Sequence, residues 1–171
     1  AIGIAGVMGG LSTEISEKTT DVLIEVAWWD PPSISRTVKR LNLMSEASMR
    51  FRRGADYGDN IERSLDRIGS LLADNGAEIA SGVEQDIGDL PSRDSIKVRT
   101  SKINSLLGVD LSAKDMKSHL ESIGFEVSVE KDDLSVVIPT WRWDTATETD
   151  ISEEVARMFG YENIRRSVPK G

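Results

Sequence analysis

Residues 85–95, QDIGDLPSRDS, constrain the fold of this chain most strongly, because they separate two stretches that each have their own periodic pattern. The segment is polar and holds Gly88, Pro91 and three aspartates, a composition typical of a linker. The full length of 171 residues suits two small domains. We therefore predict a first unit over residues 1–84, a linker over 85–95, a second unit over 96–165 and a tail over 166–171.

The first unit mixes strand and helix patterns. Residues 2–10 are apolar and rich in glycine, which indicates a short strand that runs into a tight turn. Residues 21–29, DVLIEVAWW, are apolar and β-branched and precede Asp30 and two prolines, which predicts another strand. Apolar residues then recur at steps of three and four. We expect helices over 33–43, capped by Ser33, and over 61–72, and a strand over 77–84.

The second unit has a clear alternation of element types. Ser112 is followed three residues later by Asp115, a pattern typical of a capped helix start, and Gly108 and Gly124 are suited to helix ends. We expect strands over 96–100, 125–130 and 134–139, and helices over 101–108, 112–123 and 149–159. The order β-α-α-β-β-α resembles a winged-helix arrangement, and the fold class is α+β.

Charge and cysteine content exclude several classes of function. The net charge is −8 and there is no cysteine, so disulfides and thiolate metal sites are excluded and general affinity for nucleic acid is disfavoured. No apolar run reaches the roughly 20 residues that a membrane helix needs. One stretch, 33–53, is basic and is either a solvated helix surface or a face that meets RNA. Its cations are Arg36, Lys39, Arg40, Arg50, Arg52 and Arg53, against the single acid Glu46.

Two features of the first unit could form a ligand site. Gly3, Gly6, Gly9 and Gly10 lie within eight residues, which fits either a plain tight turn or a turn that lets a ligand approach the backbone. Glu25 interrupts the apolar run VLIEVAWW, so it is either a half-exposed strand position or a buried acceptor that awaits a donor. The residues alone leave both choices open.

An acidic group marks the end of the second unit. Asp150, Glu153 and Glu154 fall on one face of the first turn of the expected helix, and Asp144 lies just upstream. Such carboxylates either cap the helix and favour its dipole, with Thr149 or Asp150 as the N-cap, or bind a hard cation such as Mg²⁺. Trp141 and Trp143 alternate upstream of these acids, so they lie on one face of an extended segment; we expect them to pack in the core, and a subunit contact is the alternative.

Four linked motifs in the first unit resemble the B3/B4 editing module of phenylalanyl-tRNA synthetase β subunits. They are GIAGVMGG (3–10), a strand with an internal Glu (22–26), DPPSI (30–34) and SEASMRFRRGAD (45–56). The resemblance implies a pocket that accepts a mischarged tyrosyl group, in which Glu25 binds the phenol hydroxyl. Gly6 and Gly9 would leave room for the aminoacyl group and offer backbone contacts, Ala47 would be a small wall, and Ala5 would also belong to the pocket. Hydrolysis would use a positioned water, with no catalytic residue in this fragment.

The stretch from Pro139 to Ile164 resembles the signature of the B5 domain of the same β subunit. The resemblance implies a Mg²⁺ site at the contact with the α subunit, formed by Asp144, Asp150, Glu153 and Glu154. Together the two resemblances identify the chain as an internal fragment, a partial B3/B4 module followed by a B5 domain.

The resemblance implies a role in a cytoplasmic, ATP-dependent ligase, an α₂β₂ tetramer that acts on tRNA(Phe). The fragment would contribute editing of Tyr-tRNA(Phe) and α/β assembly, without the aminoacylation centre, an ATP site or a membrane contact. Two alternatives stay open. One is a winged-helix nucleic-acid-binding module that reads with the helix at 112–123, and the other is a free-standing editing protein, which the attached second unit disfavours.

Overall fold

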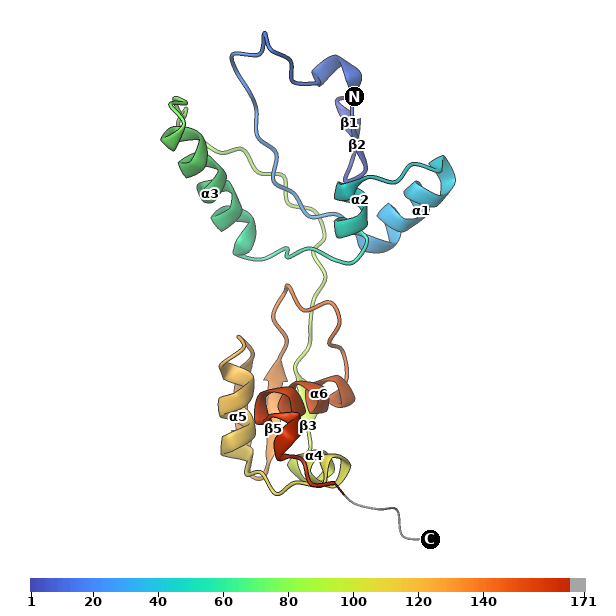
Figure 1. Ribbon diagram of the computed structural model, residues 1–171, viewed down its shortest axis with the longest axis vertical. Coiled ribbons are helices and arrows are strands. Elements are labelled where there is room, and N and C mark those ends of the chain that lie inside the picture. The colour runs from blue at the N-terminus through green and yellow to red at the C-terminus, as the bar shows by residue number, and fades with distance from the viewer. Residues whose placement is uncertain (167–171) are drawn as a thin grey trace. The chain divides into compact units, whose positions relative to one another are not determined.

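Figure 1 shows a computed structural model of the chain, which describes residues 1–166. The chain divides into two compact units, residues 1–90 and residues 91 onward. The predicted tail, except for Arg166, lies outside the described residues. Within the described part, no helix combines the length and apolar character needed to cross a membrane.

The first unit is a small hairpin followed by three α-helices. The strands β1 and β2 pair antiparallel, with Gly3 opposite Gly9 and Ile4 opposite Met8. Its elements are β1 (Gly3–Ile4), β2 (Met8–Gly9), a 3₁₀ turn (Leu11–Thr13), α1 (Pro31–Leu41), α2 (Glu46–Phe51) and α3 (Asn60–Asp74). The buried apolar cluster here is small and consists of Val7, Ile34 and Val38.

Helix α1 begins two residues before the predicted start. Asp30, not Ser33, is the N-cap: its carboxylate accepts hydrogen bonds from the Ser33 amide at 2.9 Å and the Ser33 hydroxyl at 2.6 Å. Both prolines therefore occupy the first turn, where the missing N–H groups cost no helical hydrogen bond. The chain leaves the helix at Asn42, which has a left-handed φ of 49°.

Two predicted strands of the first unit are wrong. Residues 21–29 and 77–84 contain no strand in the structure. A β-strand requires a neighbouring strand for its backbone N–H and C=O groups, and within residues 1–166 neither segment pairs with one. The apolar composition of 21–29 was therefore a misleading signal, and much of this segment is exposed.

The second unit has the predicted order, strand-helix-helix-strand-strand-helix. Its elements are β3 (Ile96–Val98), α4 (Thr100–Leu107), α5 (Ala113–Glu121), β4 (Glu126–Glu130), β5 (Asp133–Val137), α6 (Glu148–Phe159) and a 3₁₀ turn (Tyr161–Asn163). The three strands form an antiparallel sheet in the order β3-β5-β4, with Val136 of β5 opposite both Ile96 and Val127. This confirms the predicted α+β class.

The core of the second unit lies between this sheet and the three helices (Figure 1). Eleven buried apolar side chains form it, and five of them are completely inaccessible residues of helices: Ile103 of α4, Met116 and Leu120 of α5, and Ile151 and Val155 of α6. Helix α4 ends at Gly108 and α5 begins with the Ser112 and Asp115 capping box, as predicted. The apolar residues at three- and four-residue steps in these helices therefore face the core, as predicted.

Candidate functional site

The glycine-rich turn is part of the packing of the first unit. Gly6 has a left-handed φ of +65°, and a Cβ there would lie 2.7 Å from both Ile34 Cδ1 and Trp29 Cδ1. The adjacent Val7 is 1% exposed, and its amide donates to the Ile4 carbonyl at 2.9 Å. Gly6 therefore lacks a side chain for a structural reason. Gly9 differs, because a Cβ there would meet no atom within 4 Å, so its side of the hairpin is open.

The hairpin is joined to the start of α2. The Ser45 hydroxyl donates a hydrogen bond to the Val7 carbonyl and also caps α2 by accepting from the Ser48 amide at 3.1 Å. Ala47 lies in that first turn of α2 and is exposed. The structure thus connects the turn that contains Ala5 and Gly6 to the helix that carries Ala47, although these are 41 residues or more apart in sequence.

Glu25 is not joined to this group. Its side chain is exposed, and no residue in 1–166 forms a hydrogen bond or an ion pair with it. A depression of about 390 Å³ does exist in the first unit, but none of the five predicted pocket residues lines it. Its lining consists of Ser35, Val38, Lys39, Asn42, Leu43, Met44 and Arg52.

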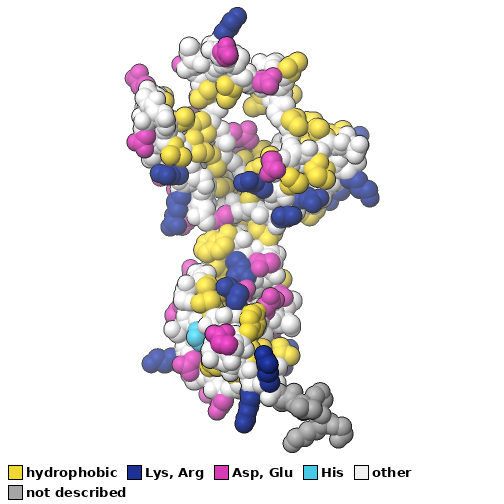
Figure 2. All heavy atoms as spheres, in the orientation of Figure 1, with side chains coloured by type: hydrophobic (Ala, Val, Ile, Leu, Met, Phe, Trp, Pro, Cys, Tyr) yellow, Lys and Arg dark blue, Asp and Glu magenta, His cyan; other side chains and the backbone are white. Residues whose placement is uncertain are grey.

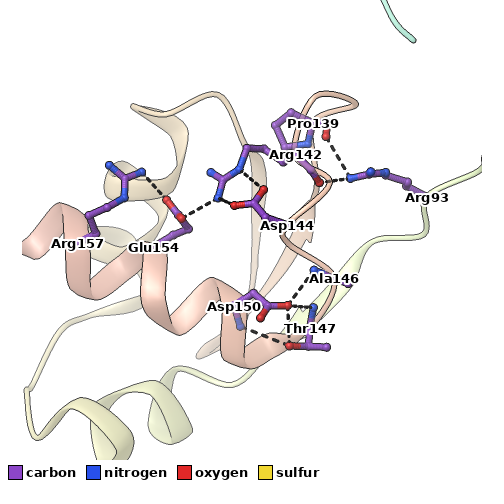
Figure 3. A network of polar contacts seen from close by, with 9 residues as sticks. All are labelled: Arg93, Pro139, Arg142, Asp144, Ala146, Thr147, Asp150, Glu154 and Arg157. Carbon is purple, nitrogen blue, oxygen red and sulfur yellow. Dashed lines mark hydrogen bonds and ion pairs between the residues drawn. The ribbon is translucent and has the colours of Figure 1, made fainter. Parts of the chain in front are cut away.

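Two of the four acids, Asp144 and Glu154, are bound by Arg142 (Figure 3). Arg142 donates from Nε and Nη2 to the two oxygens of Asp144, both at 2.8 Å, and from Nη2 to Glu154 Oε1 at 2.7 Å. Arg157 Nη2 donates to the other Glu154 oxygen at 2.5 Å. These hydrogen bonds to guanidinium groups hold the pKa of Asp144 and of Glu154 below their usual values, with Arg142 the largest cause in each case.

Asp150 caps helix α6. Its carboxylate accepts from the Ala146 amide at 2.9 Å, from the Thr147 amide at 2.8 Å and from the Thr147 hydroxyl at 2.8 Å. The backbone bond from Ala146 is the largest cause of its lowered pKa. The N-cap is Thr147, so the predicted cap at Thr149 or Asp150 is wrong by two or three residues. In a capping box the acidic residue lies three positions after the N-cap, and Asp150 lies three positions after Thr147.

In this arrangement the four acids do not fit a divalent cation. Asp144 and Glu154 are already neutralised by arginine, Asp150 is turned toward backbone amides, and Glu153 is exposed on the next turn. Across residues 1–166, no three acidic or histidine side chains gather in a way that could hold a metal ion. The spacing in sequence alone did not reveal that arginine is the partner, because Arg142 lies outside the helix.

A second arginine fixes the loop that carries Arg142. Arg93 Nη1 donates to the Pro139 carbonyl at 3.3 Å and to the Arg142 carbonyl at 2.5 Å, and its guanidinium lies 4.8 Å from the Trp143 ring centre. Trp141 packs against Gly124 and is 47% exposed. The expectation of core packing is therefore wrong for Trp141, which is exposed, and Trp143 is half-buried beside Arg93 and is not part of the core cluster.

Glu148 is an important residue that sequence reasoning did not single out. It is the first residue of α6, and its carboxylate accepts from the Arg99 amide at 2.8 Å, Arg99 Nε at 3.0 Å, Arg99 Nη2 at 2.7 Å and Lys102 Nζ at 2.6 Å. Hydrogen bonding from Arg99 is the largest cause that lowers its pKa to about 2. No local pattern indicates a contact between residues 46 to 49 positions apart.

Comparisons with known proteins agree on both units. The model of the B3/4 domain family matches residues 1–77, and the tRNA synthetase B5 domain model matches residues 96–161.

The chain is 38% identical over 171 residues to the phenylalanine–tRNA ligase β subunit of Latilactobacillus sakei, covering 99% of this chain and 21% of that protein. It is 41% identical over 172 residues to the same subunit of Geobacter sulfurreducens, with 99% and 21% covered. The subunit of Corynebacterium efficiens is 43% identical over 166 residues, with 97% and 20% covered. The chain spans about a fifth of the length of these relatives.

Proposed function

We propose, from the membership of this chain in the phenylalanine–tRNA ligase β-subunit family, that its first unit contributes to hydrolytic editing of Tyr-tRNA(Phe) and its second unit to assembly with an α subunit. The whole ligase would be a cytoplasmic α₂β₂ tetramer that joins phenylalanine to tRNA(Phe) with ATP and Mg²⁺. The aminoacylation centre and the ATP site would lie outside this chain. The observation that carries the proposal is the presence of both family domains, in order, within one chain.

The connection between the hairpin and α2 supports the editing role. A hydrogen bond from Ser45 to Val7 joins the glycine-rich turn to the helix that carries Ala47, which brings these small residues of the proposed pocket into one part of the unit. An apolar pocket that selects phenylalanine rejects the hydroxylated tyrosine only weakly, which is why a second site is needed. In that site we assign Glu25 to accept the phenol hydroxyl of tyrosine. Because Glu25 is exposed here, the remainder of the pocket would have to come from residues outside this chain.

A basic surface on the first unit supports contact with tRNA. Lysine and arginine side chains gather over α1 and α2 (Figure 2). Arg36 pairs with Asp30 at 3.8 Å and Arg50 with Glu46 at 3.7 Å, whereas four further cations have no acidic partner among residues 1–166. These four are Lys39, Arg40, Arg52 and Arg53. Unpaired cations on one face are what binding to a phosphate backbone requires, despite the net charge of −8.

The test of the editing role uses the intact ligase with Glu25→Ala. We expect the rate of Tyr-tRNA(Phe) hydrolysis to fall by about tenfold or more, because a lost charged hydrogen bond is worth roughly 1.5–3 kcal/mol. Glu14→Ala is the matched control, since Glu14 is another exposed acid of the first unit. Charging with phenylalanine should be unchanged in both variants. An unchanged deacylation rate in Glu25→Ala would remove this role from Glu25.

A second variant tests the proposed wall of the pocket. Ala47→Trp should block hydrolysis of Tyr-tRNA(Phe) by filling the space beside the hairpin, whereas Ala77→Trp, at another exposed alanine, should not. Equal hydrolysis by the two tryptophan variants would contradict the placement of the pocket at the start of α2.

The alternative role as a winged-helix reader of nucleic acid has less support. Its candidate recognition helix, α5, carries Lys114, Lys117 and His119, but Lys117 pairs with Glu121 at 3.4 Å and Asp115 lies in the first turn. This is not a basic face. The other alternative, a free-standing editing protein, is disfavoured by the B5 domain that follows in the same chain.

A further inference from the structure

We infer that the depression beside α1 and α2 is a binding site for one nucleotide of a single-stranded RNA segment. Lys39 and Arg52 hold the phosphate of this nucleotide, and the apolar floor of the depression takes its base and ribose. The inference rests on the tRNA contact proposed for the basic surface of the first unit, and gives that contact a place and a ligand chemistry. It is independent of the editing role of Glu25.

Two cations at the depression have no counter-charge. Lys39 of α1 and Arg52 at the end of α2 both line it, and neither forms an ion pair with an acid among residues 1–166. The two acids of the stretch 30–53, Asp30 and Glu46, lie beside other arginines, at 3.8 Å and 3.7 Å. Within the described chain, no acidic side chain lines the depression. A phosphodiester supplies the missing negative charge and accepts hydrogen bonds from both cations.

Two neutral donors lie at the same place. The Ser35 hydroxyl and the Asn42 side-chain amide line the depression, and in the part of the chain that the structure describes neither of them is hydrogen-bonded to protein. Both groups can donate to a phosphate oxygen or to a ribose hydroxyl. The polar lining therefore offers donors and positive charge, which is what an anionic ligand requires.

The end of helix α1 opposes an anion here, but only weakly. The helix ends at Asn42, and the amides of Asn42 and Leu43 both donate to the Val38 carbonyl. The carbonyl groups at a helix C-terminus together carry about half an elementary negative charge. The two full positive charges of Lys39 and Arg52 outweigh it, so the net field at the depression favours an anion.

The apolar floor distinguishes a nucleotide from a bare phosphate. Val38 is buried, Leu43 is half-buried and Met44 is 58% exposed, although all three line the depression. A base and ribose would cover this surface, and a volume of about 390 Å³ lies in the range of small-ligand sites. The base has to be free of a helical stack to reach the floor, so the segment is single-stranded. The flexible Met44 side chain can adapt to different bases, which predicts little base preference.

The experiment measures binding of a short, fluorescein-labelled, single-stranded oligoadenylate to the full chain by fluorescence anisotropy. The double variant Lys39→Gln/Arg52→Gln should bind about tenfold more weakly at low salt, and the slope of log Kd against log salt should fall by about 1. The matched control is Arg40→Gln/Arg53→Gln, which removes the same charge from the adjacent positions. Neither Arg40 nor Arg53 lines the depression, so this control should change the affinity by less than about threefold.

The four substituted side chains are exposed, so their replacement leaves the packing of the unit unchanged. Equal weakening in the two double variants would overturn the depression as the site and leave the tRNA contact to the basic surface as a whole. Absence of RNA binding by the unchanged chain would overturn both, and the Glu25→Ala test of editing would still stand. Tighter binding of an equally charged glutamate-rich peptide would overturn RNA as the ligand in favour of an acidic protein segment.

A second pair of variants tests the apolar floor. Met44→Ser should weaken binding of the oligoadenylate about threefold without changing the salt dependence, because it removes apolar contact and no charge. Leu41→Ser is the matched control, since Leu41 is also an exposed apolar residue, 48% exposed, but does not line the depression. Inorganic phosphate should displace the oligoadenylate only at higher concentration than adenosine monophosphate. Equal affinities of the two serine variants, or equal displacement by the two competitors, would refute the placement of a base on this floor.

Discussion

Replacement of Glu148 by glutamine should loosen the second unit by separating the start of α6 from the start of α4. The Glu148 carboxylate accepts two hydrogen bonds from the Arg99 side chain, one from the Arg99 amide and one from Lys102, and it is 13% exposed. Glutamine has nearly the same shape but no charge, so Glu148→Gln keeps the packing and weakens each of these contacts. We expect the second unit to lose stability while its fold is unchanged.

The size of the effect follows from the pKa. The folded protein lowers the pKa of Glu148 from 4.5 to about 2, which sets an upper limit of about 3 kcal/mol on the stabilisation by the ionised carboxylate. The partners Arg99 and Lys102 are 59% and 47% exposed, so solvent screens part of the attraction. At pH 7 we therefore expect Glu148→Gln to reduce the free energy of unfolding by about 1–2 kcal/mol.

The pH dependence has a definite sign. Because the pKa is lower in the folded protein, the contribution is fully present above pH 4.5 and is lost as the pH falls toward about 2. Glutamine does not titrate in this range. The difference in unfolding free energy between the unchanged chain and Glu148→Gln should therefore shrink as the pH falls from 4.5 to about 2.

The assay is denaturation by urea, followed by the NMR signals of residues in β3, α4 and α6, so that only the second unit is observed. Glu153→Gln is the matched control, because Glu153 is an exposed acid in the same helix. Its effect should stay within about 0.5 kcal/mol. The reasoning is refuted if both variants lose the same stability, or if the loss in Glu148→Gln does not depend on pH.

Three further changes have defined outcomes. Gly6→Ala should lower the free energy of unfolding of the first unit by about 1–3 kcal/mol, because position 6 has a positive φ and two atoms would lie 2.7 Å from the new Cβ. Gly9→Ala should be nearly neutral, because a Cβ there meets no atom within 4 Å. Equal losses of stability in urea denaturation would contradict this. Thr147→Ala should cost the second unit about 1 kcal/mol by removing the α6 cap, and Thr149→Ala in the same turn should cost less, as measured by thermal unfolding. Asn104→Ala should lower the free energy of unfolding of the second unit by about 1–2 kcal/mol, because the Asn104 side chain makes two hydrogen bonds of 2.9 Å to the backbone of Leu111, just before α5. Unchanged hydrogen exchange of the amides in that loop would refute this.

The structure of the second unit could largely be predicted from local signals. Its helices have apolar residues at three- and four-residue steps, a capping box at Ser112 and a glycine at position 108 with a φ of +69°. In strand β5 of its hairpin, Leu134 and Val136 are buried and the residues beside them are not. These signals act within a few residues, so one sequence suffices to read them. The same holds for the α+β class and for the family resemblance of both units.

The first unit could be predicted less well, for a physical reason. Residues 21–29 have the composition of a strand, but a strand forms only against a partner, and the described residues provide none. The proposed pocket also depends on contacts that local sequence does not show. The turn that holds Gly6 is connected to the helix of Ala47 by the hydrogen bond from Ser45 to Val7, whereas Glu25 remains exposed. Composition identifies what a segment could form, and its neighbours decide whether it does.

By itself the sequence determined the two-unit organisation, the β-α-α-β-β-α order and the family resemblance of both units. Only the tertiary structure decided the partners of the acidic side chains in the second unit. The charge on Asp144 and Glu154 is balanced by Arg142, Asp150 is turned to the amides of its own helix start, and Glu148 is bound by Arg99. Spacing along a helix fixes which carboxylates share a face, but the cation that neutralises them depends on which loops fold against that face.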